Sequence, residues 1–492
     1  MQFIMKRGIF TIILWILVWS SAVAQPAGTA FRGIAKPRVD RRLELVTIVA
    51  RLAGLREYQS ELVPLYTDSV DAWFAPHKEH PVVLHMKELR RSKGLAYDAL
   101  PVMAAYLTEP PRIRPRVSLT ETLPDWRWGL EGGTEFIRLL DRFYKDARCD
   151  EFFARQDSLY RKVETYVRSV FPKLDSEWFY RFFGEEARFG MIPVIRMMLG
   201  TANYGGDISF PDSTKEIYAF MGGLGLNRDK EPVIMSNRMA YFNTLIHEFA
   251  HSFVNPVLIT APELSPLSSA LFRAEADAMR SQGYGDGYGM IYETFTRATV
   301  IRYFMEYADS AAVADALHDE ISRCHFIWMP EAVELLGEYE ADREKYPDFR
   351  SFMPRIVEWC KEVVAQMDTI RACRAAEAEI LRERALKVVA IEPFGNGAQD
   401  VDPDLTEITI RFDRPLIGKD YAFAHGPGGK ATGVKFTGWN GYSEDKTSLT
   451  MKVELQPNRE YEFRILRNYG FVTPDGVRLY ENYLVKFRTR AE

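Results

Sequence analysis

The pattern of hydrophobic and polar positions divides this chain of 492 residues into two parts. Apolar residues repeat every three or four positions over most of residues 41–385, which is typical of amphipathic helices. From residue 386 onward they alternate with polar residues in short runs, which is typical of strands. The pattern predicts an α+β fold: a mostly helical region with a small sheet, followed by an all-β region.

The helical periodicity falls into three stretches, at 41–110, 126–172 and 310–385. Gly and Pro residues separate their segments, and the run CRAAEAEILRERALK predicts one long exposed helix near the end of the third stretch. Two apolar runs, MIPVIRMMLG at 191–200 and EIYAFMGGLGL at 216–226, are shorter and bounded by Gly and Asp. They predict the strands of the small sheet.

Six alternating runs with turn signals between them fill residues 386–492. They are VVAIEPF, EITIRFDRPL, KATGVKFTGW, SLTMKVEL, EYEFRILRNY and YLVKFRT. Their spacing predicts a seven-strand antiparallel sandwich of about 100 residues. This region holds no constellation of catalytic side chains, and its single histidine, His425 beside Gly426, is expected in a loop.

Residues 1–24 have the features of a secretory signal peptide. Lys6 and Arg7 precede an apolar core at 9–19 that is too short for a comfortable membrane span, and AVA at 22–24 fits a cleavage site. We therefore expect export to the periplasm, the cell surface or the medium, with no transmembrane segment in the mature chain. An uncleaved anchor is the alternative. Residues 25–40 predict a linker, because they hold Gly and Pro without periodicity.

Composition and charge narrow the function classes. The chain is 47% hydrophobic and 27% charged, as globular proteins are. The formal net charge is −5, and no basic stretch indicates nucleic acid or anionic lipid as a partner. Four cysteines in a chain of this length are no disulfide framework. We expect mostly buried free thiols, with a Cys360–Cys373 bridge as the alternative for that pair.

The stretch YFNTLIHEFAHSFVNP, residues 241–256, contains an H-E-x-x-H motif. His247 and His251 are four residues apart, so both imidazoles would lie on one helix face and could bind one Zn²⁺ ion. Glu248 is placed to reach a water molecule rather than the metal, as a general base does. We expect the helix to end at Asn255-Pro256, because proline disfavours a helical residue before it.

A catalytic zinc site needs a third protein ligand, and no histidine follows His251 until His318. Two downstream glutamates, Glu275 and Glu293, are candidates. We favour Glu293, because a Gly-rich turn at 283–289 precedes it and would let the backbone re-enter the site. Glu275 is the second choice, since its charged neighbours indicate a solvated face.

Candidates for orienting the ligand or contacting substrate surround Glu293. Arg297 lies four residues further on, where it could orient the carboxylate or meet the substrate. Tyr284, Tyr288 and Tyr292 are candidates for a hydrogen bond to the developing oxyanion. Packing in the core or the cleft wall is the alternative for each of these tyrosines.

Three further histidines, His77, His80 and His85, also invite a metal hypothesis. Their spacing fits one helix face poorly, and Pro76 and Pro81 break the segment. We therefore expect them at the surface or in the wall of a cleft.

The motif HEFAH with a glutamate about forty residues later resembles the gluzincin branch of zinc metallopeptidases. More narrowly, HEFAHSFVNP with the later YETFTRA is similar to a family of secreted bacterial proteins catalogued as domain of unknown function 4932. The resemblance implies a zincin-like metallohydrolase domain over residues 41–385. It implies His247, His251 and Glu293 as ligands of one zinc ion and Glu248 as the base. The chain departs from the best-known gluzincins at Arg297, where an aspartate is usual.

The resemblance also suggests roles for two regions outside the motif. In zinc peptidases the strand nearest the metal commonly aligns an extended substrate as an added strand. Asn203, Tyr204 and the following residues to 218 are candidates for that cleft edge, with a plain hairpin loop as the alternative. The start of the last region resembles bacterial Ig-like modules, so 386–492 is expected to be an Ig-like sandwich that spaces, anchors or contacts a surface or glycan.

The leading hypothesis is a secreted zinc-dependent metallohydrolase, a peptidase acting on a peptide or protein substrate. Two alternatives stay open: a non-catalytic surface or binding protein that retains a zincin fold, and a zinc amidase acting on a non-peptide or cell-wall amide. Glu248 favours catalysis, because a structural zinc site is usually closed by four ligands and needs no base.

Overall fold

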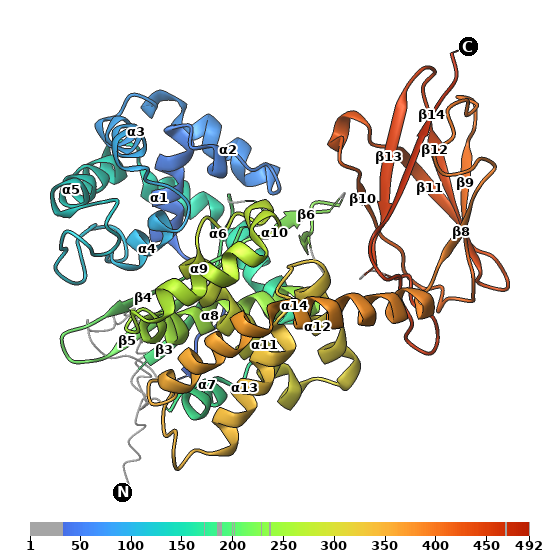
Figure 1. Ribbon diagram of the computed structural model, residues 1–492. Helices are drawn as coiled ribbons and strands as arrows, with labels where there is room; N and C mark the ends of the chain where they lie inside the picture. The colour runs from blue at the N-terminus through green and yellow to red at the C-terminus, as the bar shows by residue number, and fades with distance from the viewer. Residues whose placement is uncertain are drawn as a thin grey trace, which may run out of the picture.

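A computed structural model describes residues 33–491, except 172, 185–188, 199, 201, 228, 236–237 and 468–469. The expected signal peptide, residues 1–24, and the first part of the expected linker, 25–32, lie outside the described residues. Within them the chain forms a helical body built around a small sheet, and a separate pair of β-sheets at the C-terminal end (Figure 1). The α+β prediction is therefore confirmed.

The first layer of the body consists of helices that follow the predicted periodicity. They are α1 (Arg41–Leu52), α2 (Pro64–Phe74), α3 (Pro81–Lys93), α4 (Ala99–Ala105), α5 (Leu130–Asp146) and α6 (Cys149–Val170), with 3₁₀ turns η1 (Arg56–Tyr58) and η2 (Ala75–His77). The predicted helical stretch 126–172 is two helices, because the backbone turns at Arg148 with φ of 51°. Their apolar faces share one core that includes Leu43, Phe74 and Phe143.

The sheet lies between this layer and a second helical layer. Its strands are β1 (Gly33–Ile34), β2 (Arg38–Val39), β3 (Phe189–Ile195), β4 (Tyr204–Ser209) and β5 (Lys215–Met221), in the order β1-β3-β5-β4 with β2 also beside β3. The pairing of β3 with β5 is parallel, and that of β4 with β5 is antiparallel. Side chains of β5 alternate between the cores: Tyr218 and Phe220 face the first layer, whereas Ile217 and Ala219 face the second.

The second helical layer carries the residues of interest. It consists of α7 (Ser176–Phe183), α8 (Arg238–Leu258), α9 (Leu264–Ala274), α10 (Ala276–Ser281), α11 (Gly287–Tyr307), α12 (Ser310–Ser322), α13 (Met329–Ala341) and α14 (Met353–Arg384). A short hairpin, β6 (Leu224–Leu226) with β7 (Pro232–Ile234), precedes α8. The predicted long helix is α14, which runs from the body to the C-terminal sheets (Figure 1).

The C-terminal part is antiparallel throughout its described strands. β8 (Val388–Glu392), β9 (Glu407–Phe412), β11 (Lys435–Tyr442) and β12 (Ser448–Glu454) form one sheet; β10 (Phe423–His425), β13 (Glu460–Ile465) and β14 (Tyr483–Arg488) form the other. A 3₁₀ turn, η3 (Gly429–Ala431), precedes β11. Residues of both sheets share one core, so the two sheets make a sandwich. The loop prediction for His425 is wrong, since this residue lies in β10 and pairs with Phe463 of β13.

Two further findings concern membrane-spanning helices and the cysteines. Among the described residues, no helix combines the length and the apolar character that a membrane span requires. All four cysteines are free thiols; Cys149, Cys324 and Cys360 are buried and Cys373 is exposed, so the alternative Cys360–Cys373 bridge is absent.

Candidate metal centre

Helix α8 holds the H-E-x-x-H motif and continues to Leu258, beyond the predicted end at Asn255-Pro256. Pro256 has no N–H to donate to the carbonyl of Ser252, four residues earlier. Lys215 of β5 replaces that donor, because its Nζ lies 3.4 Å from the Ser252 oxygen. A contact from the sheet therefore supports the helix at the position where the sequence alone predicts its end.

Helix α11 carries Glu293 in its second turn. Asp286 caps the helix by accepting a hydrogen bond from the N–H of Gly289 at 2.9 Å. Gly287 allows the helix start to pack against α9, since a Cβ at this position would lie 2.4 Å from the carbonyl carbon of Ser268. The Gly-rich turn thus has the expected role of bringing the chain back to the site.

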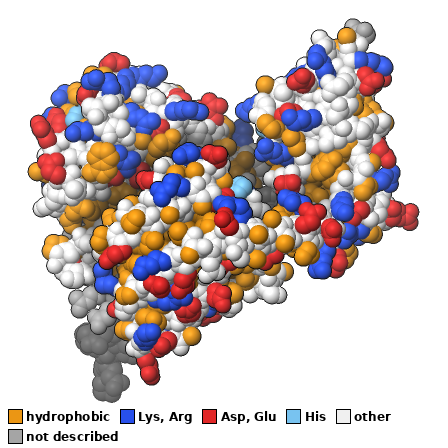
Figure 2. All heavy atoms as spheres, in the orientation of Figure 1, with side chains coloured by type: hydrophobic (Ala, Val, Ile, Leu, Met, Phe, Trp, Pro, Cys, Tyr) orange, Lys and Arg blue, Asp and Glu red, His pale blue; other side chains and the backbone are white. Residues whose placement is uncertain are grey.

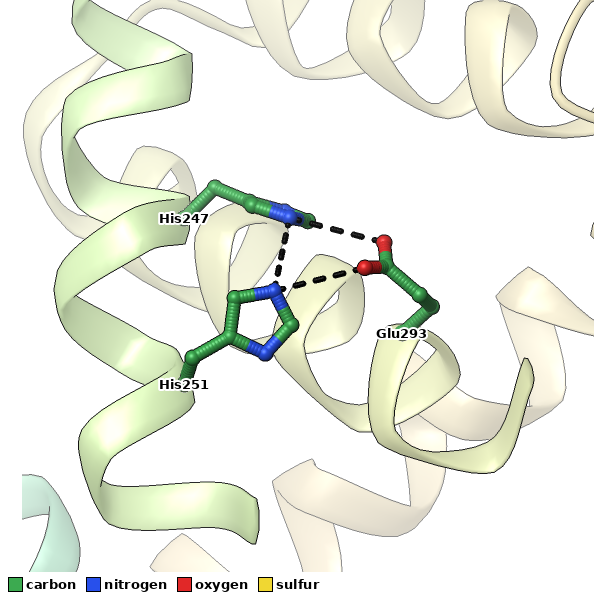
Figure 3. Close-up of side chains that lie close together, drawn as sticks. All are labelled: His247, His251 and Glu293. Carbon is green, nitrogen blue, oxygen red and sulfur yellow. Dashed lines mark hydrogen bonds and ion pairs between the residues drawn. The ribbon is translucent and has the colours of Figure 1, made fainter. Parts of the chain in front are cut away.

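His247, His251 and Glu293 meet between α8 and α11 (Figure 3). The two imidazole Nε2 atoms are 3.0 Å apart, and the Glu293 oxygens lie 3.4 Å from Nε2 of His247 and 3.3 Å from Nε2 of His251. A tetrahedral zinc ion with bonds of about 2.0–2.1 Å places its ligand atoms roughly 3.3 Å apart. The three side chains therefore fit one metal ion, and this cluster could hold one.

The ring of His251 is oriented from its far side. Its Nδ1 lies 3.2 Å from Oδ1 of Asn255 and 3.2 Å from Oγ1 of Thr296. With Nδ1 carrying the proton toward these oxygens, Nε2 keeps its lone pair for the metal. Sequence reasoning missed both residues, although each has a local signal: Asn255 lies four residues after His251, and Thr296 three residues after Glu293, on the same helix faces.

Arg297 holds the carboxylate of Glu293 in place. Its Nε donates to Glu293 Oε2 at 2.9 Å, Nη1 to Glu320 at 2.9 Å, and Nη2 to the hydroxyl of Tyr284 at 3.0 Å. Burial acts to raise the pKa of Glu293, but His247 and Arg297 outweigh burial and hold that pKa well below its usual value. Glu293 therefore stays ionised, as a metal ligand must be. Glu320, on α12, is a further residue that sequence reasoning missed.

Glu248 has a different environment from Glu293. Its side chain is 7% exposed, and no hydrogen bond or ion pair reaches its carboxylate from the part of the chain that the structure describes. Burial raises its pKa above the ordinary value, against the opposing effect of the two histidines. A buried, unpaired carboxylate next to a ligand is free to exchange a proton with a small molecule at the site.

A cavity of about 710 Å³ opens onto this site. His247, Glu248 and Arg297 line one side of it, and α12 lines the other with its alanines and acidic residues. Arg478 of the C-terminal sandwich also contributes to the wall. The cavity is large enough for several residues of an extended chain.

Strand β4, the end strand in the described sheet, lies directly against α8. A Cβ on Gly205 would be 2.4 Å from the carbonyl oxygen of Glu248, so only glycine permits this approach. Tyr204 turns to the opposite face, where the guanidinium of Arg196 lies 4.9 Å from its ring centre. Asn203 accepts a hydrogen bond from the N–H of Gly222 at 2.8 Å. The side chains of Asn203 and Tyr204 thus support the strand rather than the metal cluster.

The remaining candidates lie away from the cluster. Glu275 pairs with Arg371 of α14 at 3.1 Å and is not a member of the cluster of His247, His251 and Glu293. Tyr288 and Tyr292 contact each other, with ring centres 6.0 Å apart. The rotation of about 100° per residue in a helix turns Tyr292 away from the face of Glu293. Of the three tyrosines considered, Tyr284 is the one bonded to Arg297.

The histidines of the first layer have structural partners. His80 caps α3 by accepting from the N–H of Val82 at 3.3 Å and lies 3.4 Å from Asp146. His85 lies 2.9 Å from the carbonyl of Gly132. Within the described residues, they do not form a cluster with His77 that could hold a metal ion.

One family model matches part of this chain. Residues 131–359 match the family described as Domain of unknown function (DUF4932). The match supports the family resemblance and spans α5 to the first turns of α14, including the whole metal cluster. No curated protein matches the chain.

Two solved structures give matches of low similarity. CopC from Methylosinus trichosporium OB3b is 16% identical over 22% of this chain and 95% of its own, with a TM-score of 0.16. The S-layer protein rSbsC(31-844) is 12% identical over 51% of this chain and 37% of its own, also with a TM-score of 0.16. Scores at this level say nothing about the fold or function of this chain.

Proposed function

We propose that this protein is a zinc-dependent hydrolase that cleaves peptide bonds outside the cytoplasm. The observation that carries the proposal is the pairing of a three-ligand cluster with a separate, unpaired carboxylate, Glu248, on the wall of a cavity. A structural site has no use for such a base and is usually closed by a fourth ligand. The zincin-like assignment of the helical body and the Ig-like assignment of the sandwich belong to this proposal.

The residues of the cluster and those around it would have separate roles in hydrolysis. A zinc ion held by three protein ligands acidifies a water molecule and polarises a carbonyl group. Glu248 would take the proton of the attacking water and pass it to the leaving nitrogen. Arg297, Asn255 and Thr296 would keep the ligands in position, so that the cluster does not rearrange during the reaction.

The position of β4 supports an extended peptide as the substrate. This strand pairs with β5 along one edge, and no other described strand occupies its second edge. Gly205 places the strand against the backbone of Glu248 itself. A peptide added to that edge by main-chain hydrogen bonds would run past the proposed base.

A substitution at Glu248 tests the proposal. Purified protein and the Glu248→Gln variant are compared for zinc content and for hydrolysis of a mixed peptide pool, with and without a chelator. We expect the variant to keep its zinc and to lose activity by about 10²–10⁴-fold. Glu275→Gln is the matched control, because Glu275 lies in an ion pair with Arg371 away from the cavity. Chelator-insensitive hydrolysis, or a fully active Glu248→Gln variant, contradicts the mechanism.

A further inference from the structure

A second cavity, of about 980 Å³, lies where the sandwich meets the ends of α12 and α14. Five basic and two acidic side chains line it: Arg323, Arg382, Lys387, Arg464 and Arg467, with Asp319 and Glu481. Figure 2 shows the hollow between the helical body and the sandwich, with Lys and Arg side chains beside it. The excess of basic groups is local, because the whole chain has a formal net charge of −5.

Two of these cations have no carboxylate partner among the described residues, and two others have only long ion pairs. Neither Lys387 nor Arg464 has an ion pair with any residue in the described ranges. The guanidinium of Arg382 lies 4.6 Å from the ring centre of Tyr480, and its nearest carboxylate, Glu379, is 3.8 Å away. Arg323 is 66% exposed and 3.9 Å from Asp319. The cavity therefore presents positive charge that remains available to a ligand.

The second cavity adjoins the cavity at the metal cluster. Asp319 and Arg323, at the C-terminal end of α12, line both. The sandwich is fixed to the same helix: Arg467 lies 2.9 Å from Asp315 and 3.4 Å from Asp319, and Arg478 lies 3.1 Å from Asp315. One extended molecule could therefore reach from the metal cluster, past α12, to the basic side chains.

Neutral hydrogen-bonding groups lie among the basic residues. Asn482 accepts a hydrogen bond from the backbone N–H of Arg467 at 2.8 Å through Oδ1, which leaves its amide NH₂ as a donor. Tyr480 and Tyr483 also line the cavity. Guanidinium, amide and phenol donors together suit carboxylate groups, which accept several hydrogen bonds at once.

We propose that this basic cavity binds a carboxylate-rich segment of the substrate peptide, so that the enzyme prefers acidic sequences on one side of the bond it cleaves. The inference rests on the proposed function, since it takes the peptide in the metal cavity to be the substrate. A peptide is favoured over another polyanion because the two cavities share a wall, and a chain that occupies both would place its backbone at Glu248.

Binding can be measured without turnover. The zinc-loaded Glu248→Gln variant is titrated, by fluorescence anisotropy, with a labelled peptide that contains three aspartates and with the same peptide carrying asparagines. We expect the acidic peptide to bind about tenfold more tightly at low salt, because hydrogen bonds from cationic donors to a carboxylate are stronger than those to a neutral amide. The preference should shrink at high salt.

Variants in that background locate the site. Arg464→Gln and Lys387→Gln should each reduce the preference for the acidic peptide several-fold. Arg464→Lys should retain most of that preference, because the charge remains. Arg411→Gln is the matched control: Arg411 lies on β9 of the same sandwich, pairs with Glu392 at 3.1 Å and lines neither cavity. Circular dichroism spectra establish that each variant is folded.

The outcomes separate this inference from the proposed function. Equal binding of the two peptides, or an unchanged preference in Arg464→Gln and Lys387→Gln, overturns the basic-cavity inference even if hydrolysis is confirmed. Tight binding of an acidic polysaccharide such as polygalacturonate, without binding of the acidic peptide, also overturns it. If the preference is present but the unaltered protein hydrolyses no peptide, the proposed function fails and the acidic-peptide site stands.

Discussion

Arg297 donates a hydrogen bond to the carboxylate of Glu293 at 2.9 Å, one helical turn away on α11. The same guanidinium bonds Glu320 on α12 at 2.9 Å, so the orientation of the proposed ligand depends on a second helix. Both carboxylates are largely buried, and Arg297 provides the charge that allows this burial. The arrangement links the position of α12, which lines the cavity, to the metal cluster.

Replacing Arg297 should weaken metal binding. We expect Arg297→Met to lower zinc affinity by about 10–100-fold, as loss of a residue that orients a ligand commonly does. The variant should also be less stable by roughly 3–5 kcal/mol, because Glu320 is left buried without its partner. Adding Glu320→Gln should recover stability but not affinity. Competition with a chromogenic chelator measures affinity, and Arg371→Met, from an exposed pair with Glu275, is the control.

Two threonines on α11 form a matched pair for testing the orientation of His251. Thr296 and Thr299 are both fully buried, but Thr296 contacts Nδ1 of His251 at 3.2 Å, whereas the hydroxyl of Thr299 has no hydrogen-bond partner among the described residues. Thr296→Val should reduce zinc affinity several-fold, because it removes a bond to the ring without changing shape. Thr299→Val should leave zinc affinity unchanged and stability equal or higher. Equal effects of the two substitutions in the chelator titration would show that the contact with His251 has no role.

The buried carboxyl of Glu44 should make the free energy of unfolding depend on pH. This carboxyl is 1% exposed, and burial raises its pKa to about 7. Between pH of about 4.5 and 7 the unfolded state loses this proton while the folded state keeps it, so stability is highest below that range and falls as pH rises through it. Glu44→Gln should remove this loss. The stability of the variant relative to the unaltered protein should therefore be about 2–3 kcal/mol more favourable at pH 8 than at pH 5. Urea unfolding at pH 5 and pH 8 measures this difference in stability. Glu79→Gln is the control, because the side chain of Glu79 is 81% exposed.

The parts of the site that sequence predicted are those with local spacing. His247 and His251 share a helix, so a separation of four residues is sufficient to predict that they meet. Placing Glu293 near the histidines required one long-range step, and the Gly-rich turn before it indicated the glutamate that lies in this cluster. Glu320 could not be predicted in this way, because its contact with Arg297 depends on how α12 returns over α11. No periodicity in either helix specifies that packing.

The same distinction applies to the fold. The apolar runs at 191–200 and 216–226 predicted strands, and β3 and β5 lie there. Their parallel pairing and the place of β4 at the end of the sheet arise from contacts between distant segments. The two cavities could not be predicted either, since each needs the sandwich to be placed against α12 through Arg467 and Arg478.

The C-terminal end of α8 provides a test of how the sheet supports the helix that carries His247 and His251. Lys215 donates to the Ser252 carbonyl, which Pro256 cannot satisfy, and also pairs with Asp207 of β4 at 3.2 Å. We expect Lys215→Met to destabilise the protein by about 1 kcal/mol, the usual net contribution of such a bond. In a Pro256→Ala background the helix regains its own N–H donor, so the same substitution should cost markedly less.

Urea unfolding followed by far-ultraviolet circular dichroism measures these four proteins as a double-mutant cycle, because the helical signal reports on the body and not on the sandwich. Lys361→Met is a suitable control, since Lys361 is 58% exposed and its ion pair is with Glu358, three residues away on α14. An equal cost of Lys215→Met in both backgrounds would mean that Lys215 acts through Asp207 alone. In that case another interaction would have to explain why α8 continues through Pro256 to Leu258.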